Sequence, residues 1–258
     1  MENVRIDYKD NFAWITIDRP KALNALNHQT LRELSEALDE INGRDDVRCV
    51  LLTGAGAKAF IAGADIVEMG ALEEKEALEF SEVGHVAADK LSNFPVPTIA
   101  VVAGFSLGGG NEMALACDFI IAGENAIFGQ PEVDLGVIPG FGGTQRLARR
   151  VGAARASELI FTGRRIDAEE AQRIGLVVHI FSNETLVEEA EKIARKIASK
   201  GPVAIRLGKR ALRVGMEMDL ERGNEIERWA FSRCFDTADQ KEGMGAFIEK
   251  RSPEFKGK

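Results

Sequence analysis

Two glutamates, each beside a run of glycines, are the residues of this sequence best suited to proton chemistry. Glu112 follows three residues after Gly109, the middle glycine of "SLGGGNE". If a helix begins near Gly108, its first N–H groups have no partner within the helix and carry partial positive charge. Glycine lets a ligand oxygen approach such N–H groups closely, which makes an oxyanion hole. With Glu112 on the same helix face, the segment predicts proton transfer on a carbonyl compound.

The second glutamate, Glu132, lies in "FGQPEVDLGVIPGFGGTQRL", residues 128–147. Pro131 fixes the chain just before it, and so many glycines in one stretch favour a backbone close to a ligand or to another chain. Taken alone, Glu112 fits an ordinary first-turn glutamate and Glu132 fits a solvent-facing loop residue. The combination of both with two glycine-rich turns favours a site.

The first of these turns also contains a competing motif. Residues 104–108 read "GFSLG", a literal G-x-S-x-G around Ser106. Between a strand and a helix, this pattern marks the nucleophilic serine of α/β-hydrolases, whose histidine lies on a loop after the last strand. Only His179 follows Ser106, and it lies within a strand pattern. We therefore interpret Ser106 as a small residue at a tight turn.

A second competing motif is a dinucleotide-binding pattern. Residues 54–59, "GAGAKA", match G-x-G-x-x-A after a strand. That fingerprint requires a helix and then a second strand that ends in an acidic residue about twenty positions later. Here "EEKE", residues 73–76, lies in a helical stretch, and the next strand is expected only near residue 98. We interpret these glycines as loop formers.

The elements that must position these residues form a mixed α/β core. Alternating apolar and polar residues predict a hairpin from 4–9 and 12–18, and Asn27 can cap a helix that continues to Ile41. Further helices are expected over 65–93, from the triple glycine, and over 142–162. Short apolar runs predict buried strands at 48–54, 98–104, 118–123 and 176–181.

From Glu184 onward only helices are expected, over 184–200, 203–216, 219–235 and 238–250. We therefore divide the chain into an α/β core with parallel crossovers over 1–183 and an all-helical region over 184–258. A helical tail without strands of its own is suited to assembly.

Composition excludes several classes of protein. The 258 residues carry a formal net charge of −8, which argues against nucleic-acid binding. No apolar run approaches the roughly 18 residues of a membrane span, and the charged N-terminus is unlike a signal peptide. The three cysteines are widely spaced, without a C-x-x-C pair or a histidine-rich cluster. These features predict a cytoplasmic protein with reduced thiols and no metal.

Four segments together resemble the enoyl-CoA hydratase, or crotonase, family, and the likeness extends along the whole chain. They are "RPKALNAL" (19–26), "AFIAGADI" (59–66), "GFSLGGGNEMALACD" (104–118) and "FGQPEVDLGVIPGFGGTQRL" (128–147), and the C-terminal "GMGAFIEKR" is also similar to the family's ending. The resemblance implies a crotonase-like spiral of β-β-α units that forms two sheets, followed by a helical trimerisation region. It also implies a homo-oligomer, either a trimer or a dimer of trimers.

The same resemblance implies a reaction and the residues that perform it. A short-chain enoyl-CoA hydratase adds water reversibly to a 2-enoyl-CoA, an intermediate of fatty-acid metabolism, to give a 3-hydroxyacyl-CoA. Ala64 and Gly109 match the oxyanion-hole N–H groups. Glu112 matches the base that activates water, and Glu132 matches the donor of a proton to Cα. Coenzyme A is part of the substrate, and no metal or redox cofactor is implied.

Further positions match contacts of the family with CoA or with the acyl group. They are Lys21, Ala22, Leu23, Ala62, Asp65, Ile66, Gly108, Gly140, Phe231, Phe247 and Lys250. In the family, the last two often come from a neighbouring subunit.

Alternative chemistries of the family remain open at this point. Isomerase relatives typically work with one carboxylate, and hydrolase relatives change one or both glutamates, so the presence of both favours a hydratase. The alternative is an enoyl-CoA isomerase or another acyl-CoA lyase or hydrolase. One relative binds RNA through a lysine-rich helix, but here residues 31–46, "LRELSEALDEINGRDD", are more acidic than basic and would repel phosphates.

Overall fold

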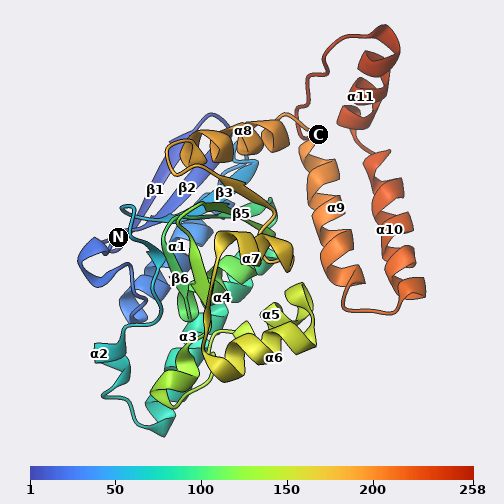
Figure 1. The fold of residues 1–258 in the computed structure, drawn as a ribbon. Helices are drawn as coiled ribbons and strands as arrows, with labels where there is room; N and C mark the ends of the chain where they lie inside the picture. The colour runs from blue at the N-terminus through green and yellow to red at the C-terminus, as the bar shows by residue number, and fades with distance from the viewer.

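The computed structural model describes residues 1–258, which contain two β-sheets and a helical tail (Figure 1). The larger sheet has the strand order β1-β2-β3-β5-β7-β10. Its strands are β1 (Val4–Lys9), β2 (Phe12–Ile17), β3 (Cys49–Gly54), β5 (Thr98–Val102), β7 (Phe119–Gly123) and β10 (His179–Phe181). The predicted hairpin is confirmed, since β1 and β2 pair antiparallel, and every other pair in this sheet is parallel.

The smaller sheet has four strands in the order β4-β6-β8-β9. They are β4 (Ala59–Ile61), β6 (Phe105–Leu107), β8 (Ile127–Gly129) and β9 (Arg165–Asp167). Patterning in the sequence predicted none of them, because a strand of three residues is too short to show a period of two.

The two sheets are built by a repeating unit. The pairs β3–β4, β5–β6 and β7–β8 each place their first strand in the larger sheet and their second strand in the smaller one. Within each sheet, the strands of successive units pair in parallel. This arrangement is the β-β-α spiral that the family resemblance implies.

The helices of the core follow clear capping signals. Asn27 caps α1 (His28–Asn42) by accepting from the Thr30 N–H. The single helical stretch expected over 65–93 is instead two helices, α2 (Ile66–Met69) and α3 (Glu74–Asn93). Asp65 caps the first, and a capping box at Glu73 begins the second, so two local N-terminal signals interrupt an otherwise helical composition. The remaining core helices are α4 (Gly109–Ala116), α5 (Gly143–Val151), α6 (Ala153–Thr162) and α7 (Ala168–Arg173), and η1 (Pro20–Ala22) and η2 (Glu132–Leu135) are 3-10 turns.

The C-terminal region contains α8 (Leu186–Ala198), α9 (Pro202–Gly215), α10 (Leu220–Cys234) and α11 (Ala238–Glu249). Its first helix belongs to the core packing, because Leu186, Ala190 and Ala194 are buried in one cluster with Phe12 and Trp14 of β2. The other three helices stand away from the sheets, with α9 and α10 side by side (Figure 1). The expected boundary at residue 184 marks where strands give way to helices in the sequence. In the structure, the helices leave the core only after α8.

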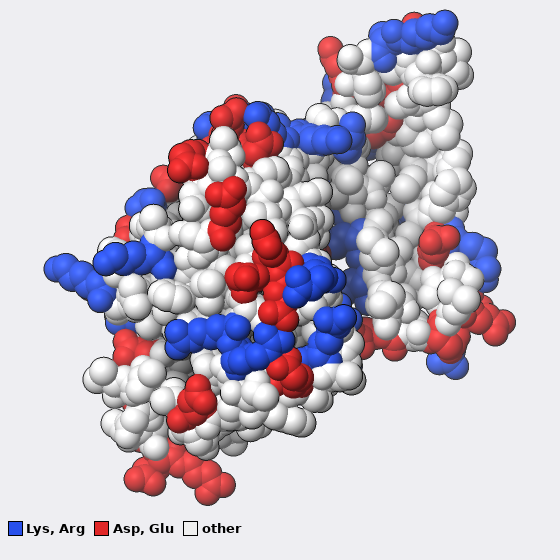
Figure 2. Space-filling view, viewed as in Figure 1, with Lys and Arg blue, Asp and Glu red and all other residues white.

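The outer helices expose several large apolar side chains. They include Leu212, Met216, Leu220, Trp229, Phe231, Phe247 and Ile248. In the space-filling view, the face formed by α9 and α10 shows few charged side chains, whereas the core surface shows many (Figure 2). No helix in the chain has the length and apolar character needed to cross a membrane.

The start of α4 is pressed against the smaller sheet. All eight residues of this helix are buried. A Cβ atom at Gly110 would lie 2.0 Å from the carbonyl oxygen of Ile61 in β4, which no bond rotation can relieve. Glycine at this position therefore sets how closely the helix approaches the strand.

We expect Gly110→Ala to destabilise the protein by about 1–3 kcal/mol, the range for overpacked sites. The matched control is Gly245→Ala in α11, where an added Cβ would have no heavy atom within 4 Å. Alanine there should be neutral or stabilise the helix by up to about 1 kcal/mol. Urea unfolding of both variants measures the difference, and equal free energies of unfolding would contradict the close approach.

Candidate active site

The Ala64 N–H is presented by two loops that hydrogen-bond to each other. The Ala62 N–H donates to the Leu23 carbonyl (3.1 Å), and the Leu26 N–H donates to the Gly63 carbonyl (2.9 Å). The Asp65 N–H in turn donates to the Leu26 carbonyl (2.8 Å). This alternation leaves the Ala64 N–H without an acceptor in the chain.

Side chains fix these two loops from behind. Asn24 is buried and its amide donates to the carbonyls of Ala55 and Ala59 (3.0 and 2.8 Å). The guanidinium of Arg19 pairs with Asp65 (3.0 Å), which is also the N-cap of α2. The position of the Ala64 N–H is thus set by several independent bonds rather than by a free loop.

The second N–H group comes from Gly109, the first residue of α4, whose N–H has no acceptor within that helix. The Ala64 nitrogen lies 3.6 Å from the position that a Cβ of Gly109 would take. The preceding Gly108 has φ of 49°, which favours glycine, and a Cβ on it would lie 3.1 Å from Oε1 of Glu132. The Ala64 N–H, the start of α4 and the carboxyl of Glu132 therefore lie close together.

Glu112 is held by the loop that leads into α5. Its Oε1 accepts from the N–H groups of Phe141 (2.8 Å) and Gly143 (2.6 Å). The side chain is only 1% exposed. Burial raises the pKa of Glu112 to about 7, although the two N–H bonds act to lower it. Its Oε2 has no hydrogen bond in the chain, so this oxygen is available to a substrate.

Glu132 begins the 3-10 turn η2 and lies across from Glu112. Burial, and to a lesser extent the charge of Glu112, raise the pKa of Glu132 to about 7. The buried Gln130, with its amide oriented as its neighbours require, donates to Oε1 of Glu132 (2.9 Å). Two carboxyls that disfavour joint ionisation share a proton most readily near neutral pH.

A cavity of about 760 Å³ brings most of the predicted site residues together. Those that line it are Ala62, Ala64, Ile66, Gly108, Gly109, Glu112, Glu132 and Gly140. Lys21, Ala22, Leu23 and Asp65 do not line the cavity, but they belong to the bonded loops beside it. Phe231, Phe247 and Lys250 lie apart, on α10 and at the end of α11 (Figure 1).

The residues of the two competing motifs, Ser106 and Gly54, have roles in packing and lie outside the cavity. Ser106 is fully buried in β6, its Oγ has no partner, and it does not line the cavity. Gly54 ends β3 where a Cβ would lie 1.9 Å from the Phe60 carbonyl oxygen, so it allows strands to approach. Neither residue faces the space where the two glutamates meet.

Sequence reasoning missed three residues that shape the site. Gln130 contacts Glu132, as described, and the N–H of Phe141 holds Glu112. Arg146 fixes that loop by donating to the Phe141 carbonyl (2.8 Å) and pairing with Asp89 of α3 (2.6 Å). The glycine-rich segment 128–147 indicated the region, but nothing in its pattern singled out these side chains.

The arrangement can polarise a carbonyl and move protons beside it. Ala64 and Gly109, whose N–H groups lack acceptors in the chain, line the same cavity as two carboxyls with pKa values near 7. No group of three or more histidine, cysteine, aspartate or glutamate side chains is placed to hold a metal ion.

Known proteins with similar sequences match this chain over nearly its whole length. A model of the family "Enoyl-CoA hydratase/isomerase" matches residues 7–258. The chain is 49% identical to the short-chain-enoyl-CoA hydratase of Clostridium acetobutylicum, over 98% of this chain and 97% of that one. It is also 49% identical to the crotonyl-CoA hydratase of Syntrophomonas wolfei, over 98% of each.

Solved structures are similar in the same way. The crystal structure of an enoyl-CoA hydratase from Bacillus anthracis superposes with a TM-score of 0.97 at 44% identity, covering 99% of this chain and 100% of that chain. Sequence, fold and site geometry agree: the chain belongs to the enoyl-CoA hydratase/isomerase family.

Proposed function

We propose that the protein is an enoyl-CoA hydratase, which adds water reversibly across the 2,3 double bond of a 2-enoyl-CoA. The observation that carries this proposal is the pair of carboxyls, Glu112 and Glu132, at one cavity with the unpaired N–H groups of Ala64 and Gly109. The similarity to a short-chain-enoyl-CoA hydratase and a crotonyl-CoA hydratase supports a short 2-enoyl-CoA as substrate.

The oxyanion hole supplies the polarisation. The N–H groups of Ala64 and Gly109 bind the thioester oxygen, and this makes Cβ of the enoyl group electrophilic. Glu112 in its ionised form takes a proton from water as the water oxygen bonds to Cβ. The electron pair of the double bond moves onto the thioester oxygen, and the enolate that forms is held by the same two N–H groups.

Glu132 completes the reaction in its protonated form. It transfers its proton to Cα, and the enolate electrons return to form the C–H bond and the thioester carbonyl. The pair thus begins and ends with one proton. It is held by Glu132 at the start, and at the end a different proton, taken from water, is held by Glu112. We propose that no metal or redox cofactor takes part and that coenzyme A enters as part of the substrate.

Two carboxyls at one cavity favour the hydratase over an isomerase. Each half of the addition needs its own proton transfer, to or from a different atom, whereas an isomerase moves one proton between two carbons. Lys21, Ala22, Leu23, Ala62, Asp65 and Ile66 are proposed to contact CoA, because their loops border the cavity next to the oxyanion hole.

We further propose that the region 184–258 forms a homo-oligomer, a trimer or a dimer of trimers. The exposed apolar side chains of α9 to α11 support this assignment, since such patches mark protein contacts. Phe231, Phe247 and Lys250 lie away from the cavity of their own chain, so they are proposed to reach a neighbouring subunit. A cytoplasmic location is also proposed, because all three cysteines are free thiols.

The proposed roles predict a clear split among three variants. We expect Glu112→Gln and Glu132→Gln each to lower kcat for crotonyl-CoA about 10²–10⁴-fold, because each removes one proton transfer. Ser106→Ala is the control and should keep wild-type turnover, since the serine does not reach the cavity. Loss of the enoyl-thioester absorbance measures the rate. Full activity in either glutamate variant would contradict the assigned mechanism.

The rate should also depend on pH in a specific way. With pKa values of about 7 for both carboxyls, the singly protonated pair is most populated near pH 7. Below this range Glu112 is protonated and the base is lost, and above it Glu132 is ionised and the acid is lost. We expect kcat/KM to fall on both sides, approaching tenfold per pH unit.

The pH dependence of the residual activity of Glu132→Gln distinguishes the fall of kcat/KM at low pH from its fall at high pH. That variant has no titrating acid, so its rate should rise through the low-pH limb and then stay level. A wild-type profile that is flat between pH 5.5 and 8.5, or one that Glu132→Gln leaves unchanged in shape, contradicts the assignment.

The tail makes a separate prediction about assembly. Phe247 is 85% exposed on α11. We expect Phe247→Asp to lower the sedimentation coefficient while the circular dichroism stays unchanged, because an exposed side chain adds little to folding. Val187→Asp, an exposed apolar site on α8, is the matched control and should sediment like the wild type. Wild-type sedimentation by Phe247→Asp would remove this residue from the proposed interface.

A further inference from the structure

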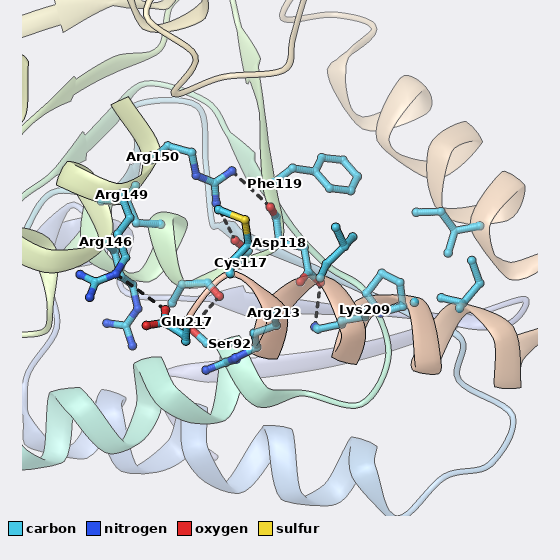
Figure 3. A pocket seen from close by; sticks show the side chains of 18 of the residues that line it. Ser92, Cys117, Asp118, Phe119, Arg146, Arg149, Arg150, Lys209, Arg213 and Glu217 are labelled. Atoms are coloured by element: carbon cyan, nitrogen blue, oxygen red, sulfur yellow. Dashed lines mark hydrogen bonds and ion pairs between the residues drawn. The ribbon is translucent and has the colours of Figure 1, made fainter. Parts of the chain in front are cut away.

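A second cavity, of about 780 Å³, lies between α9 and the core (Figure 3). Its walls come from one face of α9, from the end of α4 and the start of β7, and from α5. It shares no lining residue with the cavity that contains Glu112 and Glu132. Nothing in the proposed reaction uses this space.

The cavity is positively charged in a chain that is acidic overall. Its lining carries five cationic side chains and two carboxylates, an excess of three positive charges, although the chain as a whole carries −8. The cations are Arg146, Arg149, Arg150, Lys209 and Arg213, and the carboxylates are Asp118 and Glu217. Such a local excess favours an anionic ligand.

Most of these cations already have partners in the chain. Arg150 donates to the carbonyls of Cys117 and Asp118 (3.3 and 3.2 Å), which connect α4 to β7. Lys209 pairs with the Asp118 carboxylate (2.7 Å) and donates to the Val96 carbonyl (3.0 Å). Arg149 lies 3.7 Å from Glu217. These contacts hold the walls together and are satisfied without a ligand.

Arg213 is the exception. Its Nη1 is shielded from solvent and has no hydrogen-bond partner. Burial lowers the pKa of Arg213, and the nearby charge of Arg146 lowers it further, so the surroundings disfavour its positive charge. Arg213 makes no hydrogen bond or ion pair in the chain although it lines the cavity, so an anion there would pair with the nitrogens of its guanidinium other than the shielded Nη1.

The rest of the cavity offers apolar surface along the same helix. Ile205, Lys209 and Arg213 recur every four residues, so they form one stripe on α9. The first turns of the stripe are apolar, with Ala204 and Ile205, and its end is basic. Leu115 and Phe119 of the core add apolar surface to the lining. A ligand that matches this stripe has an apolar body and an anionic head.

We propose that this cavity binds a small amphipathic anion, with its anionic head on Arg213 and its apolar body along the first turns of α9. The head is of the phosphate class, because a tetrahedral oxyanion can accept from several donors of a guanidinium at once. This site is independent of the proposed hydratase reaction, so either proposal can fail without the other.

Calorimetric titration with two matched probes tests the proposal. Hexyl phosphate has both head and body, and 1-hexanol has the same body without the charge. The wild-type protein should bind hexyl phosphate at least about tenfold more tightly than 1-hexanol. Arg213→Gln should weaken hexyl phosphate about tenfold and leave 1-hexanol unchanged, while Arg213→Lys, which keeps the charge but loses the fork of donors, should bind with an affinity between those of the wild type and Arg213→Gln.

The control is Arg206→Gln, which removes the same charge from an exposed position on the same helix and outside the cavity. It should behave as the wild type. Turnover of crotonyl-CoA in phosphate-free buffer should be unchanged in Arg213→Gln, which verifies folding. Binding of hexyl phosphate at the active-site cavity would not respond to Arg213, so the comparison of variants separates the two cavities.

Three outcomes overturn the proposal. The first is equal affinity of the wild type for the two probes. The second is the same loss in Arg206→Gln as in Arg213→Gln, which would reflect net charge alone. The third is a changed sedimentation coefficient in Arg213→Gln without any effect on the probes, which would assign Arg213 to a carboxylate of a second copy of the chain.

Discussion

The site depends on how a buried carboxyl is held without being fully neutralised. Two N–H bonds, from Phe141 and Gly143, reach one oxygen of Glu112 and leave the other oxygen to the cavity. Burial alone would keep this group protonated, and the N–H bonds alone would keep it ionised at neutral pH. The balance of the two places its pKa at about 7, where a carboxyl can exchange protons in both directions.

The loop that supplies these N–H groups is itself held by longer-range contacts. Arg146 joins the Phe141 carbonyl to Asp89 of α3. The Phe141 ring packs edge-to-face on Phe80, and a Cβ at Gly84 would collide with it at 2.0 Å. The position of Glu112 is therefore fixed by α3, α4 and α5 together. Through this network, residues that do not touch the substrate, such as Asp89 and Gly84, still help to position Glu112.

The spiral places the parts of the oxyanion hole at neighbouring turns. Ala64 follows β4 and Gly109 follows β6, and these two strands pair in parallel in the smaller sheet. Chain ends that leave paired parallel strands at the same edge come together, so two distant N–H groups meet without a dedicated loop. The outer helices take no part in this geometry, which leaves their apolar faces available for contacts outside the chain.

Local sequence patterns are enough to identify the residue types of the site and the turns and helix ends on which they lie. The triple glycine with Glu112, the glycine-rich run around Glu132, the cap at Asn27 and the parallel strands of the larger sheet all follow from patterns over a few residues. These patterns survive because capping, turn formation and helix termini are local effects. The resemblance of four segments to the family further predicted the spiral fold. It also predicted that the N–H groups of Ala64 and Gly109 together form the oxyanion hole.

Which of these residues come together, and how their surroundings shift their pKa values, depends on the packing of the whole chain. The three-residue strands of the smaller sheet exist through pairing across the spiral rather than through their own periodicity. The raised pKa values of the two glutamates require burial, and burial depends on how α3, α4 and α5 pack. The roles of Gln130, Phe141 and Arg146, and the unpartnered nitrogen of Arg213, likewise arise from contacts between segments distant in sequence. Local patterns cannot specify such contacts, because burial and electrostatic coupling depend on the whole packed chain.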